Sequence, residues 1–294
     1  MQESRAHAEH APFDAPPRAS RLALRAWRAT AEALHAHWPE YCLEALGLGL
    51  FMLSACAFVA LLEHPASFLR QALPDAFTRR ALIGLAMGLT AVALIYSPLG
   101  KRSGAHLNPA LTATFWRLGR IHTPDAMFYM LFQFAGGSAG VALFSFLSGN
   151  AVISDAAVNY AVTVPGMAGR WPAFLAEALI SAGLMFTVLT VSNKPALNRY
   201  TGLFAGALVA LFIVFEAPLS GMSMNPARTF ASALAARIWT DAWIYFVAPV
   251  AGMLIAAEIY LMTRGSNAVL CCKLHHDNDS RCIFPCRYHA CSET

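Results

Sequence analysis

Long apolar runs separated by short polar connections occupy most of the 294-residue chain. Six of these runs approach the ~20 residues that a helix needs to cross the hydrocarbon core of a bilayer. They cover residues 42–62, 81–98, 126–148, 173–192, 201–217 and 240–262. Their frequent Gly and Ala residues suit helices that pack backbone to backbone within lipid. The pattern predicts an all-α membrane protein with six transmembrane helices.

Composition agrees with this prediction and narrows the possible classes of function. Hydrophobic residues make up 57% of the chain and charged residues 13%, which is too apolar for an ordinary soluble domain. The net charge is +4, but the cations are scattered between apolar runs rather than gathered on one stripe, as nucleic-acid binding would require. No Gly-rich phosphate loop or nucleophile and base pair is recognisable. We therefore expect an integral membrane protein that contacts lipid, binds no nucleic acid and is not an enzyme.

The distribution of Lys and Arg predicts the orientation in the membrane. An even number of spans places both termini on one side. Fifteen Lys and Arg residues lie in the two terminal segments and in the second and fourth connections, whereas six lie in the other connections. Because cytoplasmic connections carry the excess of cations, both termini are predicted to be cytoplasmic, in a cell membrane or inner membrane.

Residues 1–40 form an N-terminal segment with an amphipathic pattern. Its apolar positions are Leu24, Trp27, Ala31, Leu34 and Trp38. Its basic positions are Arg18, Arg21, Arg25 and Arg28. Spacings of three and four residues place the two sets on different faces of a helix. Two interpretations remain open, a cytoplasmic helix lying on anionic lipid or a helix packed against the spans.

An internal repeat is the most informative feature of the chain. Ser103–Ala110 and Ser220–Ala227 follow the second and fifth spans, share five of eight residues and both end in Asn-Pro-Ala. In the first span Glu44 has a counterpart in Glu177 of the fourth. Each repeat holds three spans, an odd number, so the second repeat is inverted relative to the first.

The Asn-Pro-Ala tripeptides are typical of helix starts, since Asn is a good N-cap and Pro is favoured at the first helical position. We expect short helices from Ala110 to about Leu118 and from Ala227 to about Ala235. Neither is long enough to cross the bilayer, so each is a half-helix that reaches the midplane from one side. Non-helical backbone at that depth is tolerated only inside protein or beside a watery cavity. The repeat therefore predicts a pore.

With these two turns in matching frames, residues from about 41 to 262 resemble the aquaporin and glycerol-facilitator family, the major intrinsic proteins. The resemblance implies six transmembrane helices plus two half-helices, repeats at about 41–150 and 171–262, and a homotetramer with a pore in each subunit. It also implies passive passage of water or other small uncharged solutes, exclusion of protons and cations, and no cofactor for the channel.

The resemblance implies roles for the residues at the turns. These residues are Asn108, Pro109, Ala110, Asn225, Pro226 and Ala227. The asparagines would direct amide N–H groups into the pore, the prolines would set the turns and the alanines would allow close approach. Each half-helix N-terminus is equivalent to about half a positive charge, which repels cations. The next residue, Arg228, matches the family's filter arginine, and its alternative role is a buried ion pair.

Glu44 and Glu177 are charges within the predicted spans, and two interpretations compete for them. They form a proton relay, as in a coupled transporter, or they accept hydrogen bonds from irregular backbone around the turns. The family resemblance favours the second. We expect His106 to brace the same loop rather than to act as a ligand or base.

Matching the chain to the family's narrowest point gives a filter of Met87, Ile213, Met222 and Arg228. The match at Met87 requires an insertion near Lys101. Water-selective members place Phe, His and a small residue beside the arginine, and glycerol-passing members place Trp, Gly and Phe with an Asp after it. This chain has neither set, and Thr229 follows its arginine. The alternative solutes are larger neutral ones, namely a metalloid hydroxide, urea or ammonia.

Residues 263–294 form a cytoplasmic tail that holds five of the seven cysteines. Its candidate metal ligands are Cys271, Cys272, His275, His276, Cys282, Cys286, His289 and Cys291. Cytoplasmic thiols stay reduced, which disfavours disulfides, and thiolate and imidazole clusters bind Zn²⁺ or Cu(I). Acylation near the membrane or an inert tail is the alternative. For the whole chain, one alternative is a channel mainly for such a larger neutral solute, regulated by metal at the tail. The others are a proton-coupled transporter and a membrane-bound metal sensor.

Overall fold

The computed structural model describes the backbone of residues 18–288 and the side chains from residue 26 to residue 288. Two candidate ligands, His289 and Cys291, lie outside the described residues, as do the side chains of Arg18, Arg21, Leu24 and Arg25. Within the described part all regular elements are helical, and no strand occurs. This confirms the predicted all-α class.

Six helices are long and apolar enough to cross a membrane. They are α1 (Arg18–Glu63), α3 (Ala76–Tyr96), α6 (Thr123–Ser148), α8 (Arg170–Ser192), α9 (Thr201–Phe215) and α12 (Trp243–Arg264). Each contains most of one predicted apolar run. Shorter helices connect them, namely α2 (Phe68–Ala72), α4 (Pro98–Ser103), α5 (Pro109–Arg117), α7 (Asn150–Ile153), α10 (Ala217–Ser220) and α11 (Pro226–Ala236). Three 3₁₀ turns lie at Asn159–Ala161, Asn198–Tyr200 and Ser266–Ala268.

The two repeats pack in the same way. Helix α1 lies along α6 in the first, α8 lies along α12 in the second, and α3 lies along α9 between them. Glycines permit these contacts. A Cβ on Gly136 of α6 would overlap the backbone of Ala45, and a Cβ on Gly252 of α12 would overlap the backbone of Ala178. Backbones therefore approach closely at equivalent points of both repeats, as small residues allow within lipid.

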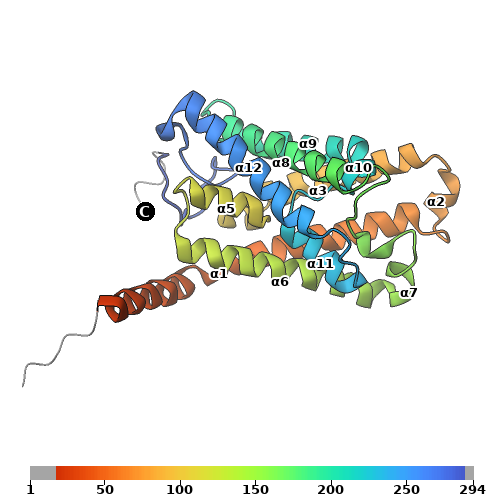
Figure 1. Ribbon diagram of the computed structural model, residues 1–294, viewed down its shortest axis with the longest axis horizontal. Coiled ribbons are helices and arrows are strands. Elements are labelled where there is room, and N and C mark those ends of the chain that lie inside the picture. The colour runs from red at the N-terminus through yellow and green to blue at the C-terminus, as the bar shows by residue number, and fades with distance from the viewer. Residues whose placement is uncertain (1–17, 289–294) are drawn as a thin grey trace, which may run out of the picture.

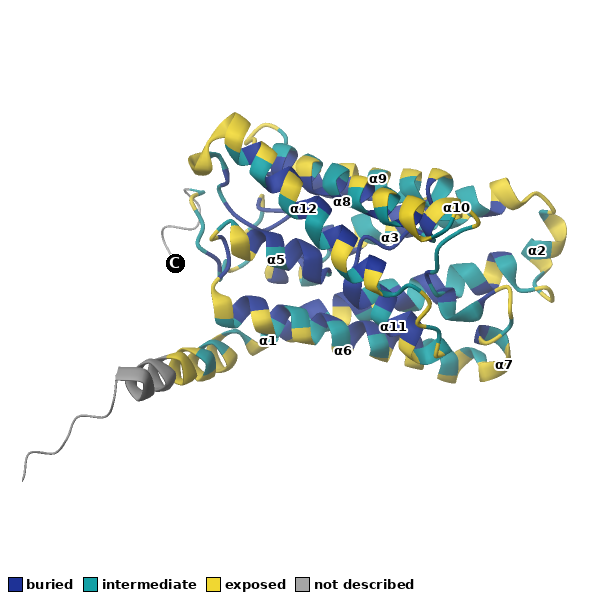
Figure 2. Ribbon diagram, viewed as in Figure 1, coloured by how far each residue is buried: buried dark blue, intermediate teal, exposed yellow. Residues whose placement is uncertain are grey.

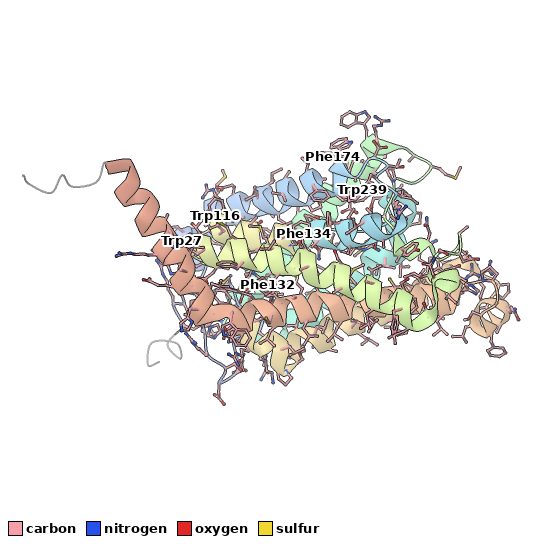
Figure 3. The ribbon with its side chains drawn as sticks, turned by 90° about the horizontal axis from the view of Figure 1, so that it is seen from below. Trp27, Trp116, Phe132, Phe134, Phe174 and Trp239 are labelled. Atoms are coloured by element: carbon pink, nitrogen blue, oxygen red, sulfur yellow. The ribbon has the colours of Figure 1, made fainter. Side chains whose placement is uncertain are left out.

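Helix α1 joins the predicted N-terminal helix and the first span. It is one helix of 46 residues, about 69 Å long at 1.5 Å per residue, so it exceeds the thickness of the bilayer core. Pro39 lies inside it, where a proline removes a backbone hydrogen bond and bends the helix. Figure 3 shows that the part carrying Trp27 leaves the bundle at an angle. Trp27 and Trp38 are mostly exposed there, so these two side chains do not pack against the spans of their own chain, whereas His37 contacts Asp125 of α6 at 2.7 Å.

The half-helices α5 and α11 lie inside the ring of long helices (Figure 1). They point away from each other, and their N-termini meet near the middle of the molecule. Most residues of both are buried, and Figure 2 shows α5 almost wholly in the buried colour. The N-terminal part of α1 and the tail that follows α12 lie at the same end of the bundle (Figure 1).

Candidate pore and tail site

Both Asn-Pro-Ala turns start a helix as predicted. The Asn108 side-chain oxygen accepts a hydrogen bond from the N–H of Ala110 at 2.8 Å. The Asn225 oxygen accepts from the N–H groups of Ala227 at 3.0 Å and Arg228 at 3.2 Å. Proline occupies the first turn in both helices. The asparagines thus satisfy backbone donors that lack helical partners at a helix start.

The same asparagines also connect the two repeats. Asn108 donates from Nδ2 to the carbonyl of Met224 at 2.7 Å, and Asn225 donates from Nδ2 to the carbonyl of Leu107 at 2.7 Å. A side-chain amide has two N–H donors, so one proton of each is used between the repeats. The second proton remains for the pore, and both asparagines border the cavity described below.

A buried carboxylate braces the backbone before each turn. Glu44 accepts hydrogen bonds from the N–H groups of His106 at 3.0 Å and Leu107 at 2.6 Å. Glu177 accepts from the N–H groups of Ser223 and Met224, both at 2.7 Å. Serines from the start of the repeated frame, Ser103 and Ser220, donate to the same carboxylates at 2.7 Å. Each carboxylate therefore has at least three donors, and its contacts match those of its partner in the other repeat.

These bonds hold a backbone conformation that amino-acid side chains disfavour. Ala105 and Leu107 have φ of 56° and 48°, and their counterparts Met222 and Met224 have 51° and 54°. A left-handed conformation costs about 1–2 kcal/mol for each such residue and persists only where neighbouring groups determine it. The hydrogen bonds to the two carboxylates fix this conformation. Alternation of left-handed residues was not apparent from the sequence, which carries no glycine at these four positions.

A second pair of polar contacts follows the repeat. His106 contacts Thr112 through Nδ1 at 3.1 Å, and its counterpart Ser223 contacts Thr229 through Oγ at 2.6 Å. His106 is buried, and its other nitrogen lies 3.1 Å from the carbonyl of Cys272 in the tail. It therefore joins the loop to both its half-helix and the tail, a contact that the sequence did not indicate.

Three further polar residues of the site were missed by sequence reasoning. Tyr129 of α6 and Tyr245 of α12 donate through their hydroxyls to the carbonyls of Ser103 and Ser220. Gln133 donates to Glu44 at 2.8 Å. A signal for the tyrosines was present, because each lies seven residues before a glycine, Gly136 or Gly252, in the last span of its repeat.

One cavity of about 550 Å³ runs through the molecule. Its lining includes both asparagines and all four predicted filter residues, Met87, Ile213, Met222 and Arg228. One end reaches Glu63 and Arg79, which form an ion pair at 3.1 Å. The other end reaches Leu274, and we call it the tail-side mouth. Arg228 is half-buried, and its Nη1 has no hydrogen-bond partner among the described residues.

Comparison with known proteins agrees with this arrangement. The family model described as major intrinsic protein matches residues 32–260. The chain belongs to the major intrinsic protein family. Its members are channels for water and small neutral solutes, not enzymes.

Individual relatives include plant proteins. Aquaporin NIP1-2 of Arabidopsis thaliana is 32% identical over 225 residues, which cover 75% of this chain and 72% of the relative. Aquaporin NIP2-2 of Zea mays is 35% identical over 185 residues, which cover 63% and 60%. The match therefore spans 60% of the length of the maize relative. An aquaglyceroporin structure from Plasmodium falciparum covers 76% of this chain and 96% of its own, with a TM-score of 0.62 at 20% identity, and shares the fold.

The two repeats differ in length near Lys101. Helix α4 has six residues where its counterpart α10 has four, and both end at the serine of the repeated frame. The residue after the filter arginine, Thr229, is buried and contacts Thr163 at 2.8 Å as well as Ser223. It is therefore part of the scaffold behind the pore and does not line the cavity.

The tail gathers four of its predicted metal ligands. The ligand atoms of Cys271, His276, Cys282 and Cys286 all lie within 4.8 Å of one another. Hydrogen bonds from the thiols of Cys271 and Cys286 lower the pKa of Cys282, which favours its thiolate. These four residues are spaced C-x4-H-x5-C-x3-C, without the two-residue spacing of familiar zinc motifs.

Two other predicted ligands do not join the cluster, which corrects the larger set. Cys272 donates through its sulfur to the carbonyl of Arg120 at 3.0 Å, and burial raises the pKa of its thiol. His275 lies edge-on to Tyr96 with ring centroids 4.8 Å apart, and burial lowers its pKa. Neighbouring residues along an extended chain point to different sides. Therefore only one residue of each adjacent pair, Cys271 and His276, belongs to the cluster.

Proposed function

We propose that this protein is a passive channel for small uncharged solutes. The observation that carries the proposal is a single cavity lined by both Asn-Pro-Ala asparagines and by Arg228. The N-termini of α5 and α11 meet beside it, so two helix dipoles direct positive potential at one point. Arg228 adds a full charge about one helical turn from Asn225. This potential repels cations and protons but does not repel neutral solutes.

Passage would proceed along hydrogen-bonding groups fixed by the repeats. Each turn asparagine has one amide proton left for the pore, and a water that accepts from both is turned away from its neighbours in the file. The interruption of the hydrogen-bonded file prevents proton conduction. Cross-repeat bonds to Met224 and Leu107 hold both amides in place, so the donors need no rearrangement when a solute arrives.

A proton-coupled transporter is less well supported. A relay needs carboxylates that exchange protons along a path, yet Glu44 and Glu177 each accept at least three hydrogen bonds. Neither lines the cavity. We infer that both are structural braces and that Arg228 serves in the filter, since it makes no ion pair among the described residues.

The solute class follows from the other filter residues. Met87, Ile213 and Met222 line the cavity together with Arg228 and contribute apolar groups, so among these four residues only Arg228 offers polar contacts. Methionine is unbranched and flexible, and no filter histidine narrows the opening. We propose that a neutral solute larger than water, such as a metalloid hydroxide, urea or ammonia, passes in addition to water.

The surroundings of the pore complete the proposal. We infer a homotetramer in a cell membrane or inner membrane with both termini in the cytoplasm, in line with the Lys and Arg distribution. The exposed Trp27 and Trp38 of the projecting part of α1 suit contact with the lipid surface. For the tail we infer a bound Zn²⁺ or Cu(I) ion at its cluster of three thiols and one imidazole, ligands that both ions accept.

Stopped-flow light scattering of the protein in liposomes tests the channel proposal. Gradients of water, glycerol, urea and arsenite are applied to chelator-treated and to metal-loaded protein. We expect at least one solute to equilibrate faster than in protein-free vesicles, without a proton or sodium gradient. Flux that requires such a gradient would support the transporter instead. Flux equal to that of empty vesicles in every preparation would refute the channel.

A further inference from the structure

We propose that Cys271, His276, Cys282 and Cys286 form a tetrahedral zinc site, and that zinc holds residues 271–276 across the tail-side mouth to restrict flux. The flux part of this proposal rests on the channel function proposed above. The zinc part does not, because it depends only on the geometry of the tail.

The four ligand atoms lie within 4.8 Å of one another, and two of their separations are close to those of a zinc coordination sphere. The sulfurs of Cys271 and Cys282 are 3.7 Å apart. Nε2 of His276 lies 3.1 Å from the sulfur of Cys286. Two sulfurs bound at about 2.3 Å to a tetrahedral zinc lie about 3.8 Å apart, and a sulfur and an imidazole nitrogen about 3.5 Å. Only small side-chain movements are needed to place one ion between them.

A buried cation beside the cluster indicates that the occupied site is negative. Arg120 is 7% exposed, and its Nε has no hydrogen-bond partner among the described residues. It lies close enough to Cys271, Cys272 and Cys286 for its charge to act on their thiols. Three thiolates around Zn²⁺ give a net charge of minus one, which compensates a guanidinium that is otherwise costly to bury. Arg120 therefore fits the outer shell of such a site.

A disulfide switch explains the same cluster less well. A disulfide joins two sulfurs at about 2.05 Å and leaves the third thiol and the imidazole without a role. No disulfide joins any two of the described cysteines, not even Cys271 and Cys282, whose sulfurs are 3.7 Å apart. Three thiols and one imidazole converging on one point are typical of structural zinc, which takes four ligands.

The segment of residues 271–276, which runs from the first ligand to the second, is fixed against the pore loop. All six of these residues are buried. The N–H of Leu274 donates to the carbonyl of Gly104 at 3.1 Å. The carbonyl of Cys272 lies 3.1 Å from Nε2 of His106. Farther along the tail, Phe284 stacks on His106 with ring centroids 5.6 Å apart and planes within 9°. The tail thus lies directly on the loop that leads to Asn108.

Leu274 is the residue by which this segment acts on the pore. It lines the cavity at the tail-side mouth, and His106 and the two asparagines line the same cavity. It lies between Cys271 and His276, so the zinc would fasten the segment on both sides of it. An apolar side chain at a pore mouth opposes the passage of water and polar solutes. Release of the zinc would free this segment and open the mouth.

Metal content tests the site itself. Purified full-length protein loaded with zinc is expected to hold one ion per chain, and Cys286→Ser and Cys282→Ser to hold much less. Cys42→Ser, which alters an exposed thiol of α1 that is not part of the cluster, is the matched control. Cobalt(II) in place of zinc should give the visible absorption of a tetrahedral thiolate site. Zinc binding that survives both tail variants, or no binding at all, would overturn the site.

Water and urea flux into liposomes tests the restriction. If zinc keeps the mouth closed most of the time, chelation or Cys286→Ser should raise flux on the order of tenfold, because a rarely open state becomes dominant. Leu274→Ala should raise flux as much while retaining the zinc. If the wild-type protein shows the same flux with zinc bound as after chelation, the restriction is overturned but the channel function is not. Absence of flux in every variant would instead refute the channel function, while the metal measurement still decides the zinc site.

Discussion

At the scale of single residues, the pore is built from side chains that have a double use. Asn108 and Asn225 each cap a half-helix through oxygen and join the repeats through nitrogen. A substitution there removes a cap, a connection and a pore donor together, so its effect on flux cannot be assigned to one cause. Arg228 is different, because its guanidinium has one nitrogen without a partner among the described residues and lines the cavity.

Arg228→Ala is therefore expected to alter selectivity more than folding. Removing the charge lowers the barrier to cations, and about 1.4 kcal/mol of barrier corresponds to about a tenfold rate. We expect potassium or proton leak through liposomes to rise by at least that factor while water flux is kept. Arg237→Ala, at the exposed far end of the same half-helix, serves as the control. An unchanged leak would contradict a filter role for Arg228.

Glu216, just beyond the last residue of α9, gives a pH-dependent prediction. Its carboxylate has no partner among the described residues, since the neighbouring Ser220 hydroxyl donates its one proton to Glu177. Burial, with a smaller effect of Glu177, raises the pKa of Glu216 from 4.5 to about 7. The folded protein therefore keeps this proton at pH values where the unfolded chain has lost it. Stability is full below about pH 4.5 and is lost as the pH rises to about 7.

Glu216→Gln should remove that loss. At pH 8 the variant is expected to be more stable than the wild type by on the order of 2 kcal/mol, and at about pH 4.5 the two should be equal. Thermal unfolding in detergent at several pH values measures the difference. Glu32→Gln, at an exposed position of α1, should show no such dependence. A stability difference between variant and wild type that is the same at both pH values would show that Glu216 ionises freely.

At the scale of helices, the apolar runs predict where the spans lie, because lipid requires both length and apolarity. The half-helices could be predicted as well, since an Asn cap and a following Pro define a helix start locally. The length of α1 could not, because the first apolar run begins only at residue 42, whereas the helix continues without a break on the N-terminal side through Pro39. Nor could the turn conformation, since left-handed Leu107 and Met224 depend on carboxylates distant in sequence.

Close helix contacts give a prediction at this scale. Gly136→Ala adds a methyl group against the backbone of Ala45 between α6 and α1. We expect a loss of stability of about 1–3 kcal/mol, as for other overpacked sites, seen as a lower unfolding temperature in detergent. Gly183→Ala in α8 is the matched control, because its nearest contact would be an ordinary 3.7 Å to Phe212. Equal effects of the two changes would mean that the helices move apart without cost.

At the scale of the whole molecule, the inverted repeat predicts the pore but not the tail. The repeat is visible in the sequence because both halves build the turn before the half-helix from the same residues. The tail has no counterpart, and its eight candidate ligands gave no basis for choosing among them. Only the fold brings Cys271, His276, Cys282 and Cys286 together, because the segments between them are fixed by contacts with Gly104, His106 and Arg120.

The orientation of the molecule connects the charge pattern to the chemistry of the tail. Described parts of both ends lie on one side of the bundle (Figure 1), and the excess of Lys and Arg predicts that this side is cytoplasmic. A cluster of three thiols needs a reducing compartment to remain available to metal. The predictions from loop charge and from thiol chemistry therefore favour the same orientation.

Reporter fusions test this orientation. A fluorescent protein that matures only in the cytoplasm, joined after residue 294, should be bright, and a phosphatase active only outside the cytoplasm should be inactive there. Fusions after residue 150, in the connection between α6 and α8, should give the reverse pattern, since three spans precede that point. The opposite result at both sites would place the tail in an oxidising compartment. Its thiols would then form disulfides, and both the cytoplasmic termini and the zinc-held mouth would have to be abandoned.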